Sequence, residues 1–336
     1  MTDRPEGTSR PRAFSAPDRR LVLALLGVLV VVFALVGSNV AASHSPKPHD
    51  VPVGVVGTPP VTGAASAALR TRAPGAYRVH EYTSLAAART AILHRSVYGA
   101  YRPLPSPELL VASAASPTVA GLLEQTAGAA TRSQGRALAV RDLVPLPSSD
   151  SRGATAFSAV LGLLIASIMG STVIYLLGQH RPPAVRLAAM VALGIAAGLV
   201  TALVTNVVVG AFPRQFLGMW GVATLFVLAL GLSIVAFQVL VGVAGTAIGA
   251  VMFLVIGNPA SGGSSAPELL PGFWRGLSQL LPPGAATTAM RDVVYFNGHG
   301  MTHALVVLGL YAVLGAAVAI TVSTLRARAT HSAPAT

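Results

Sequence analysis

Long apolar runs and polar stretches alternate along this chain, and their order predicts its elements. Residues 21–43 form a first apolar run, residues 44–153 hold half of the charged residues, and residues 154–325 are again strongly apolar. A bilayer core about 30 Å thick requires roughly 20 apolar residues in each spanning helix. The pattern therefore predicts one membrane-spanning helix, a water-soluble insert, and then a block of further spanning helices.

The second apolar block divides at polar or turn-forming residues. Its longest uninterrupted part, residues 216–257, would form a helix roughly 60 Å long at about 1.5 Å per residue, twice the thickness of a bilayer core. This part must therefore reverse direction, and the cluster of Gln238, Gly242 and Gly245 marks the expected turn. The block is predicted to contain five spans, at about 155–177, 187–209, 216–238, 243–257 and 303–325.

The insert 44–153 has the pattern of a small extracytoplasmic α/β domain. Val51–Val56 is an apolar run closed by turn residues and Tyr77–Tyr82 alternates in polarity, so both are predicted strands. Ser84 is a predicted helix cap. The remaining expectations are an inward face of Ala87, Ala91 and Ile92 on a helix ending near His94, helices over 62–72 and 118–133, and strands over 97–101, 108–112 and 137–144. Strands that alternate with short helices are typical of α/β domains.

Arginines flank the predicted spans and indicate their orientation. They precede the first span at residues 19–20, lie in the short loop 178–186, and follow the last span at 326–328. Cytoplasmic loops carry an excess of Lys and Arg. Both chain ends are therefore predicted to be cytoplasmic, which places the insert 44–153 outside the plasma membrane of a multi-pass protein.

The two ends of the chain are polar. Residues 1–20 are rich in Pro and Arg and are predicted to be a disordered cytoplasmic tail, and residues 326–336 a second tail. The first apolar run could also be a signal peptide cleaved at the small residues Ala41–Ser43. Its length favours an uncleaved anchor, and either interpretation places the insert outside.

Composition agrees with a membrane protein and excludes several chemistries. The chain is 53% hydrophobic and 10% charged, with a mean hydropathy of +0.67, whereas soluble domains carry roughly 25% charged residues. The net charge of +12 comes almost wholly from arginines that form no basic stripe, so a nucleic-acid partner is not expected. The chain has no cysteine, which removes thiol catalysis, Cys-zinc sites and iron–sulfur clusters.

Few polar groups lie within the predicted spans. Asn206 and Gln238 are the notable ones, and each is expected to make hydrogen bonds between helices or to line a pathway. Small residues recur every fourth position, as expected where helices pack closely in lipid. These are Gly162, Ala166 and Gly170 in one span, Gly194, Gly198 and Ala202 in the next, and Gly245 and Gly249 in the short one.

No reactive constellation is visible in the sequence. His299 and His303 are four residues apart, as in some metal sites, but Gly298 and Gly300 argue against a shared helix and no third ligand is evident. The chain lacks the GxxxxGK[ST] phosphate loop and any Ser/His/Asp set. We therefore predict no catalytic residue, no cofactor and no metal on this chain, and any ATP must be bound by another subunit.

Residues 258–302 are neither a span nor an ordinary loop. They contain an amphipathic piece over 273–281 and a second short helix over 285–296. The segment is expected to lie in or dip into the outer leaflet, since its aromatic residues suit a membrane interface; these are Phe273, Trp274, Tyr295 and Phe296. Arg291 and Asp292 either pair with groups in the bundle or belong to a solvated helix end.

Three features together resemble a known family of membrane proteins. The first is the layout of one helix, an outer α/β domain and five helices. The second is the start of that domain at 51–56 and its exit at 144–153, which reads Val-Pro-Leu-Pro-Ser-Ser-Asp-Ser-Arg-Gly. The third is the set Ser261-Gly-Gly, Pro267-Glu-Leu-Leu-Pro271-Gly-Phe-Trp274, Leu281-Pro282 and Arg291. Over roughly 20–325 the chain resembles the ABC-2 type transporter permease superfamily, in its YhgE/Pip-like or DUF3533-like branch.

The resemblance implies a multi-pass permease subunit in the lipid bilayer, usually a homodimer, that works with a separate nucleotide-binding ATPase. It would export a hydrophobic or amphipathic substrate. Pro267, Pro271, Trp274 and Arg291 are expected to be structurally decisive without being catalytic. The alternative is an ATPase-independent surface receptor or a secretion or assembly scaffold.

Overall fold

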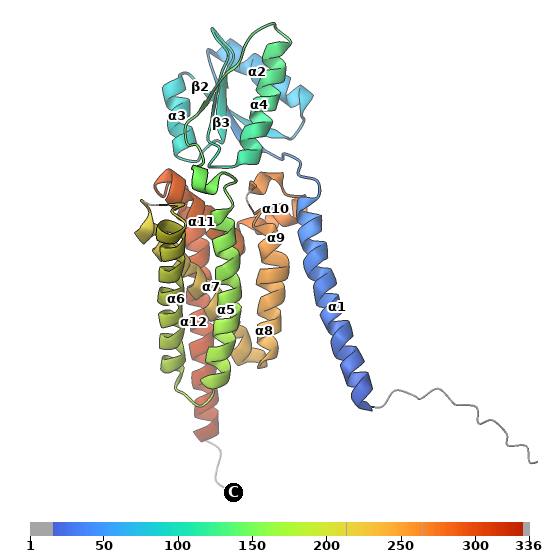
Figure 1. Cartoon of the computed structure of the whole chain (residues 1–336), viewed down its shortest axis with the longest axis vertical. Helices are drawn as coiled ribbons and strands as arrows, with labels where there is room; N and C mark the ends of the chain where they lie inside the picture. The colour runs from blue at the N-terminus through green and yellow to red at the C-terminus, as the bar shows by residue number, and fades with distance from the viewer. Residues whose placement is uncertain (1–15, 213, 264, 332–336) are drawn as a thin grey trace, which may run out of the picture.

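The chain folds into an α/β domain placed on one end of a helical bundle (Figure 1). This computed structural model describes residues 16–212, 214–263 and 265–331. The outermost parts of the two predicted tails, 1–15 and 332–336, lie outside the described residues. Helix α1 (Ala16–Ser43) stands beside the bundle and contacts it at α9 (Asn258–Ala260) and at the π-helical segment Ala250–Gly257 before α9.

The α/β domain is a five-stranded sheet covered on both sides. Its strands are β1 (Val51–Val56), β2 (Tyr77–Tyr82), β3 (Gly99–Arg102), β4 (Glu108–Val111) and β5 (Ala139–Asp142). The order is β2-β1-β3-β4-β5, with β3 and β4 antiparallel and the other pairs parallel. The sequence of β1 is almost wholly apolar, as expected for a strand that is buried on both faces.

Three helices complete the domain. They are α2 (Pro59–Arg72), α3 (Leu85–Leu93) and α4 (Pro117–Arg132). Helix α3 lies on one side of the sheet, and α2 and α4 lie on the other (Figure 1). Ser84 caps α3 by accepting a hydrogen bond from the Ala87 amide, as expected. The inward face differs by one position, since Ala88 is buried with Ala91 and Ile92 while Ala87 is exposed.

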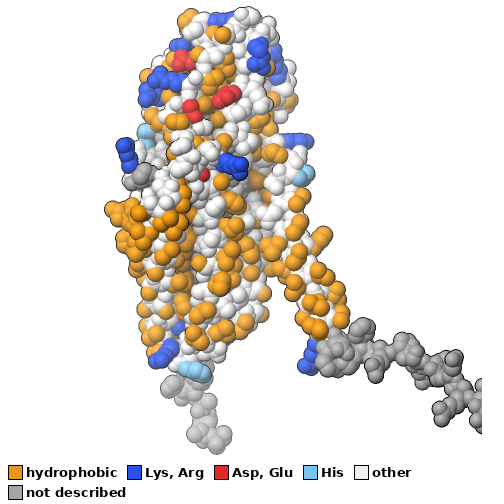
Figure 2. All heavy atoms as spheres, viewed as in Figure 1, with side chains coloured by type: hydrophobic (Ala, Val, Ile, Leu, Met, Phe, Trp, Pro, Cys, Tyr) orange, Lys and Arg blue, Asp and Glu red, His pale blue; other side chains and the backbone are white. Residues whose placement is uncertain are grey.

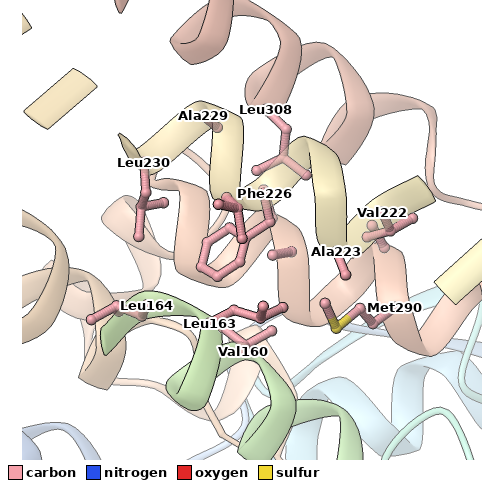
Figure 3. Close-up of a cluster of buried hydrophobic side chains, with 14 of the residues drawn as sticks. Val160, Leu163, Leu164, Val222, Ala223, Phe226, Ala229, Leu230, Met290 and Leu308 are labelled. Carbon is pink, nitrogen blue, oxygen red and sulfur yellow. The ribbon is translucent and has the colours of Figure 1, made fainter. Parts of the chain in front are cut away.

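The bundle is built around α7 (Phe216–Val241). Against it pack α5 (Thr155–Leu177), α6 (Pro183–Ala202), α11 (Pro282–Phe296) and α12 (Thr302–His331). Figure 3 shows the resulting core, in which Phe226 of α7 lies among aliphatic side chains of α5, Met290 of α11 and Leu308 of α12. Helix α6 continues into a π-helical segment, Leu203–Val208.

The long apolar run divides where glycine permits a turn. Helix α7 ends at Val241, Gly242 has a φ of +72°, and α8 (Ala244–Gly249) starts the return. A Cβ on Gly245 would lie 2.3 Å from the carbonyl carbon of Phe237, so only glycine lets the two arms of this hairpin meet. After α8 the chain continues through the π-helical segment Ala250–Gly257 into α9.

Among the described residues, five helices are long and apolar enough to cross a membrane, which indicates insertion of this mostly helical protein into a bilayer. They are Arg19–Ser43, Thr155–Leu177, Pro183–Val208, Phe216–Val241 and Thr302–Arg326. The remaining expected span, 243–257, corresponds to the shorter apolar helix Ala244–Ala260. Apolar side chains cover much of the outward surface of α1 and the bundle (Figure 2).

The segment 258–302 contains short helices, as the sequence predicts, but one of its expected interface aromatics is buried. It contains η4 (Pro267–Leu269), α10 (Gly272–Ser278) and α11, and α11 is largely buried between α5, α7 and α12. Phe296 is buried in the core of the α/β domain rather than placed at a lipid interface, whereas Phe273 is exposed. Small residues on α11 allow this close packing.

Candidate functional site: a buried charged junction

A buried ion pair joins the α/β domain to the bundle. Arg95 follows α3, and its Nε donates to Oδ1 of Asp292 on α11 over 2.8 Å. Only 13% of the Arg95 side chain and 1% of the Asp292 side chain are exposed. The Arg95 guanidinium also lies 4.9 Å from the ring centre of Phe296 and 5.4 Å from that of Tyr98. Charged groups are rarely buried unless they are paired in this way.

Arg95 occupies a backbone position that usually belongs to glycine. The Arg95 amide donates to the Ile92 carbonyl and the Ser96 amide to the Ala91 carbonyl, which together form a Schellman turn at the end of α3. Arg95 has a φ of 64°, a left-handed conformation that costs a non-glycine residue roughly 1–2 kcal/mol. The Schellman turn is therefore kept despite a local cost, and it directs the Arg95 side chain toward α11.

A glycine on the bundle side makes room for the ion pair. Gly300 lies between α11 and α12 with a φ of +92°. A Cβ at this position would lie 2.9 Å from Oδ2 of Asp292 and 3.0 Å from Cβ of Arg95. Next to it, the rings of His94 and His299 stack with centroids 4.2 Å apart. The end of α3 and the end of α11 are thus in direct contact.

A second carboxylate of the bundle reaches the α/β domain. The Tyr98 hydroxyl, just before β3, donates to Oε2 of Glu268 in η4 over 2.9 Å. The Glu268 carbonyl accepts from the His49 amide in the linker after α1. Glu268 therefore ties η4 both to the domain and to its entry segment.

A third contact fixes the exit segment of the domain. Asp150 is buried in η1 (Ser148–Asp150), and its Oδ1 accepts the amides of Ala154 and Thr155 at the start of α5. Its Oδ2 accepts a 2.8 Å hydrogen bond from the Tyr295 hydroxyl of α11. A carboxylate at a helix N-terminus satisfies amides that have no partner inside the helix. Asp150 thus couples the start of α5 to α11.

Arg291 occupies the interior of the same junction. It is buried, and its guanidinium faces the carbonyls of Ser265 and Gly263 at 3.4 and 3.5 Å. Burial lowers the pKa of Arg291, and repulsion from Arg95 lowers it further. Neither residue belongs to a solvated helix end, which was one of the two expected alternatives. Arg291 faces carbonyls of the segment before α11, as the other alternative expects, but Asp292 pairs with Arg95 of the α/β domain and not with a group in the bundle.

Burial and neighbouring charges shift the pKa values of the junction residues in opposite directions. Burial raises the pKa of Asp292, and Arg95 and Arg291 offset part of this rise. Burial lowers the pKa of Arg95, but the combined effects of Tyr98, Asp292 and Glu268 outweigh it, so the net pKa is raised. Burial raises the pKa of Tyr98, and Glu268 adds to the rise. Tyr98 is therefore a neutral hydrogen-bond donor to Glu268, and together with the Arg95–Asp292 pair it links the α/β domain to the bundle.

The other predicted site residues lie outside the ion pair. Asn206 donates to the Ala202 carbonyl and to Thr205 within its own helical segment, and Gln238 donates to Thr246 over 2.9 Å across the α7–α8 hairpin. Pro267 begins η4 beside Glu268, and Pro271 precedes α10. Trp274 packs edge-on against Phe273, with ring centroids 5.2 Å apart. Of the six predicted residues, only Arg291 and Pro267 thus lie within or next to the junction.

His299 and His303, which are four residues apart in the sequence, have separate neighbours in the structure. His299 stacks on His94, and Nε2 of His303 lies 3.2 Å from the Gln279 carbonyl oxygen. Within the described part of the chain, no group of three or more His, Asp or Glu side chains could hold a metal ion.

Sequence reasoning did not identify Arg95, Tyr98, Asp150, Glu268 and Tyr295. One signal was nevertheless present. Glu268 and Asp292 are the only acidic residues after position 150, and the structure directs both of them at the α/β domain. Isolated carboxylates in an apolar block are costly to bury alone, so each of them predicts a partner elsewhere.

Comparison with family models, with curated proteins and with solved structures finds no match to this chain.

Proposed function

We propose that this chain is the membrane-spanning subunit of an ABC-2-like exporter that moves a hydrophobic or amphipathic substrate outward. In this proposal two copies form a homodimer, a separate ATPase binds at the cytoplasmic end, and six helices cross the plasma membrane. The crossing in addition to the five long helices is Ala244–Ala260, whose 17 residues are at the lower end of the roughly 17–25 that span a bilayer.

The distribution of charge supports the proposed orientation. Arg181 lies between α5 and α6, and Arg186 on α6 donates to Ser323 on α12. Arg326 on α12 donates to the Leu240 carbonyl at the end of α7. These arginines lie at the end of the bundle opposite the α/β domain (Figures 1 and 2). Positive charge marks the cytoplasmic side.

The junction is the observation that carries the proposal. The outer domain contacts α11 through Asp292 and Tyr295, and α11 packs against the central α7 and against α5 and α12. A displacement of the domain is therefore transmitted to the bundle interior through packed and charged contacts. This connection suits a permease in which an outer domain gates or receives what the bundle releases.

The decisive experiment asks whether an ATPase accompanies the chain. We expect the tagged protein, purified from its native membranes in mild detergent, to carry a subunit with a GxxxxGK[ST] loop detectable by mass spectrometry. Arg181→Glu should reduce this recovery, since Arg181 is an exposed cation at the proposed cytoplasmic end. Arg141→Glu, an exposed site on β5, is the control. Recovery of an envelope protein without any ATPase would instead support the receptor or scaffold function.

Reporter fusions test the proposed topology. We expect alkaline phosphatase fused after Glu124 in α4 to be active, since it folds only outside the cytoplasm, and a fusion within 178–182 to be inactive. A cytoplasmic fluorescent protein should give the reverse pattern at the same two sites. An inactive phosphatase fusion at Glu124 with normal expression would contradict the whole arrangement.

A further inference from the structure

The α/β domain contains a large cavity that the junction does not use. It measures about 530 Å³ and lies between α2, α4 and the sheet. This volume is within the range of roughly 300–1,000 Å³ that is usual for small-molecule sites. Six of its 24 lining residues are polar or charged, and they are Arg72, Tyr77, Tyr101, Thr126, Gln134 and Arg136.

The cavity exists because α2 is held to the sheet by polar contacts. Thr62 and Ser66 are the buried residues of α2, and Thr62 donates to Oε2 of Glu81 on β2 over 2.6 Å. The Ser66 hydroxyl donates to Oε1 of Glu81 over 3.5 Å. The apolar side of α2 meanwhile faces the cavity, with Ala65, Ala68 and Leu69 among its lining.

Alanines on both helices leave the space between them unfilled. Ala65 and Ala68 of α2 are opposed by Ala127 and Ala130 of α4. The cavity is partly open to solvent, so its apolar lining faces water when no ligand is present. A hydrocarbon chain that filled the cavity would remove this apolar surface from water, which is favourable. The hydrogen bond between Tyr77 and Thr126, 3.3 Å long, links β2 to α4 along the lining.

Each end of the cavity carries one arginine. Because β1 and β2 are parallel, α2 returns along the sheet, and Arg72 at its end lies near the start of both strands. Arg136 precedes β5, whose direction places it at the opposite end. Arg136 is engaged, since it donates to the carbonyls of Pro103 and Pro105. Arg72 is exposed and has no hydrogen bond or ion pair with any described residue.

We propose that this cavity binds a long-chain amphiphile with an anionic head group, its hydrocarbon part lying between α2 and α4 and its head group pairing with Arg72. The apolar lining accounts for the chain, and the available guanidinium accounts for the head group, because Arg pairs well with carboxylate and phosphate. The end of the sheet that holds Arg72 is also the end that faces the bundle, since β1 follows α1 and β3 follows Tyr98. An amphiphile leaving the membrane would therefore meet this end first.

Single cysteines test the proposal, because the natural chain has none. Ala68→Cys places a thiol on the cavity lining, and Ala67→Cys places one on the neighbouring position outside it. Both positions are exposed, so both thiols react when no ligand is present. The full chain, in phosphatidylcholine nanodiscs, is labelled with a maleimide in the presence of dodecanoate. At a dodecanoate concentration of about ten times its dissociation constant, labelling at position 68 should slow about tenfold, since only the free fraction reacts. Labelling at position 67 should not change.

Charge variants then test the head group. Arg72→Glu in the Ala68→Cys protein should abolish the protection by dodecanoate, whereas Arg70→Glu, two residues away on α2 and outside the lining, should preserve it. Dodecyltrimethylammonium, with the same chain and the opposite charge, should not protect position 68.

Two outcomes overturn the inference. Equal slowing at positions 67 and 68 would show adsorption to the surface or to the nanodisc, and an unchanged rate at position 68 up to the solubility limit of dodecanoate would show no binding. The inference rests on the α/β domain and not on export. Because binding is measured without an ATPase or transport, its failure would leave the proposed function untouched, and the absence of an ATPase would leave the binding site untouched.

Discussion

Asp292→Ala is expected to destabilise the protein by about 3–5 kcal/mol, because it leaves the Arg95 guanidinium buried without its partner. The ion pair is almost inaccessible to water. Without the Asp292 carboxylate, nothing offsets the free energy needed to bury the Arg95 charge. The α/β domain should separate from α11, and the segments 44–50 and 143–153 that connect it to the helices should become accessible. Thermal melting of the full chain in detergent and limited proteolysis of these segments measure the two effects.

A double variant separates lost pairing from lost packing. Arg95→Met combined with Asp292→Leu should be far more stable than Asp292→Ala, since an apolar pair of similar volume leaves no unpaired charge. The matched control is the ion pair of Arg102 with Glu108, in which Nη2 and Oε2 are 2.6 Å apart. It is more exposed than the junction pair, with 24% of the Arg102 side chain and 20% of the Glu108 side chain accessible. Removing Glu108 should cost less than about 1 kcal/mol. If Asp292→Ala and Glu108→Ala have equal effects, the junction does not hold the two parts together.

Gly198→Leu is the second substitution with a large expected effect, and it should prevent accumulation of a monodisperse protein. Gly198 of α6 is buried against α7, where a Cβ would lie 2.4 Å from Oγ1 of Thr224 and 2.9 Å from the Trp220 carbonyl oxygen. Backbone atoms cannot move aside as a flexible side chain does, so α6 and α7 would have to separate. Overpacking typically costs about 1–3 kcal/mol and more where the backbone must shift. Membrane expression and gel filtration in detergent report the loss.

Gly162→Leu is the matched control. Gly162 belongs to the same kind of four-residue spacing, but a Cβ there meets nothing within 4 Å. This variant should be produced and behave as the wild type, because its new side chain enters open space on α5. Equal loss with both variants would show that added bulk, and not the α6–α7 contact, is responsible.

These two glycines show why spacing alone overstates helix contacts. The sequence offered both as members of small-residue faces, yet only Gly198 faces a neighbouring helix. Gly170, in the same row as Gly162, does face α6, since its Cβ would meet the Leu193 side chain. The spacing identifies residues that can permit an approach, but the rotation of each helix decides which of them do.

Local pattern predicted the strands of the α/β domain more closely than it predicted their arrangement. Val51–Val56 and Tyr77–Tyr82 have the expected bounds, because polarity and turn residues on either side delimit each strand. The sheet order and the reversal of β4 against β3 depend on pairings between distant residues. No periodicity in one segment carries information about its partner.

In the segment 258–302, too, the sequence predicted the local elements but not their surroundings. Its sequence indicated short helices with charged and aromatic residues, and the structure contains α10 and α11 there. The expectation of a membrane-surface position was wrong for Phe296, which is buried in the α/β domain. An aromatic residue suits an interface and a core equally well, so only its neighbours distinguish the two.

The sequence by itself determined the alternation of apolar helices with a polar α/β insert and the need for a turn near Gly242, because helix length and local polarity are set by neighbouring residues. The tertiary structure alone decided that Arg95 meets Asp292 and that Asp150 meets Tyr295, since these partners are 197 and 145 residues apart. It also decided that α2 and α4 line a partly open apolar cavity. Such contacts arise only after the elements have packed, and the cost of burying a charge or leaving a void is defined by what surrounds it.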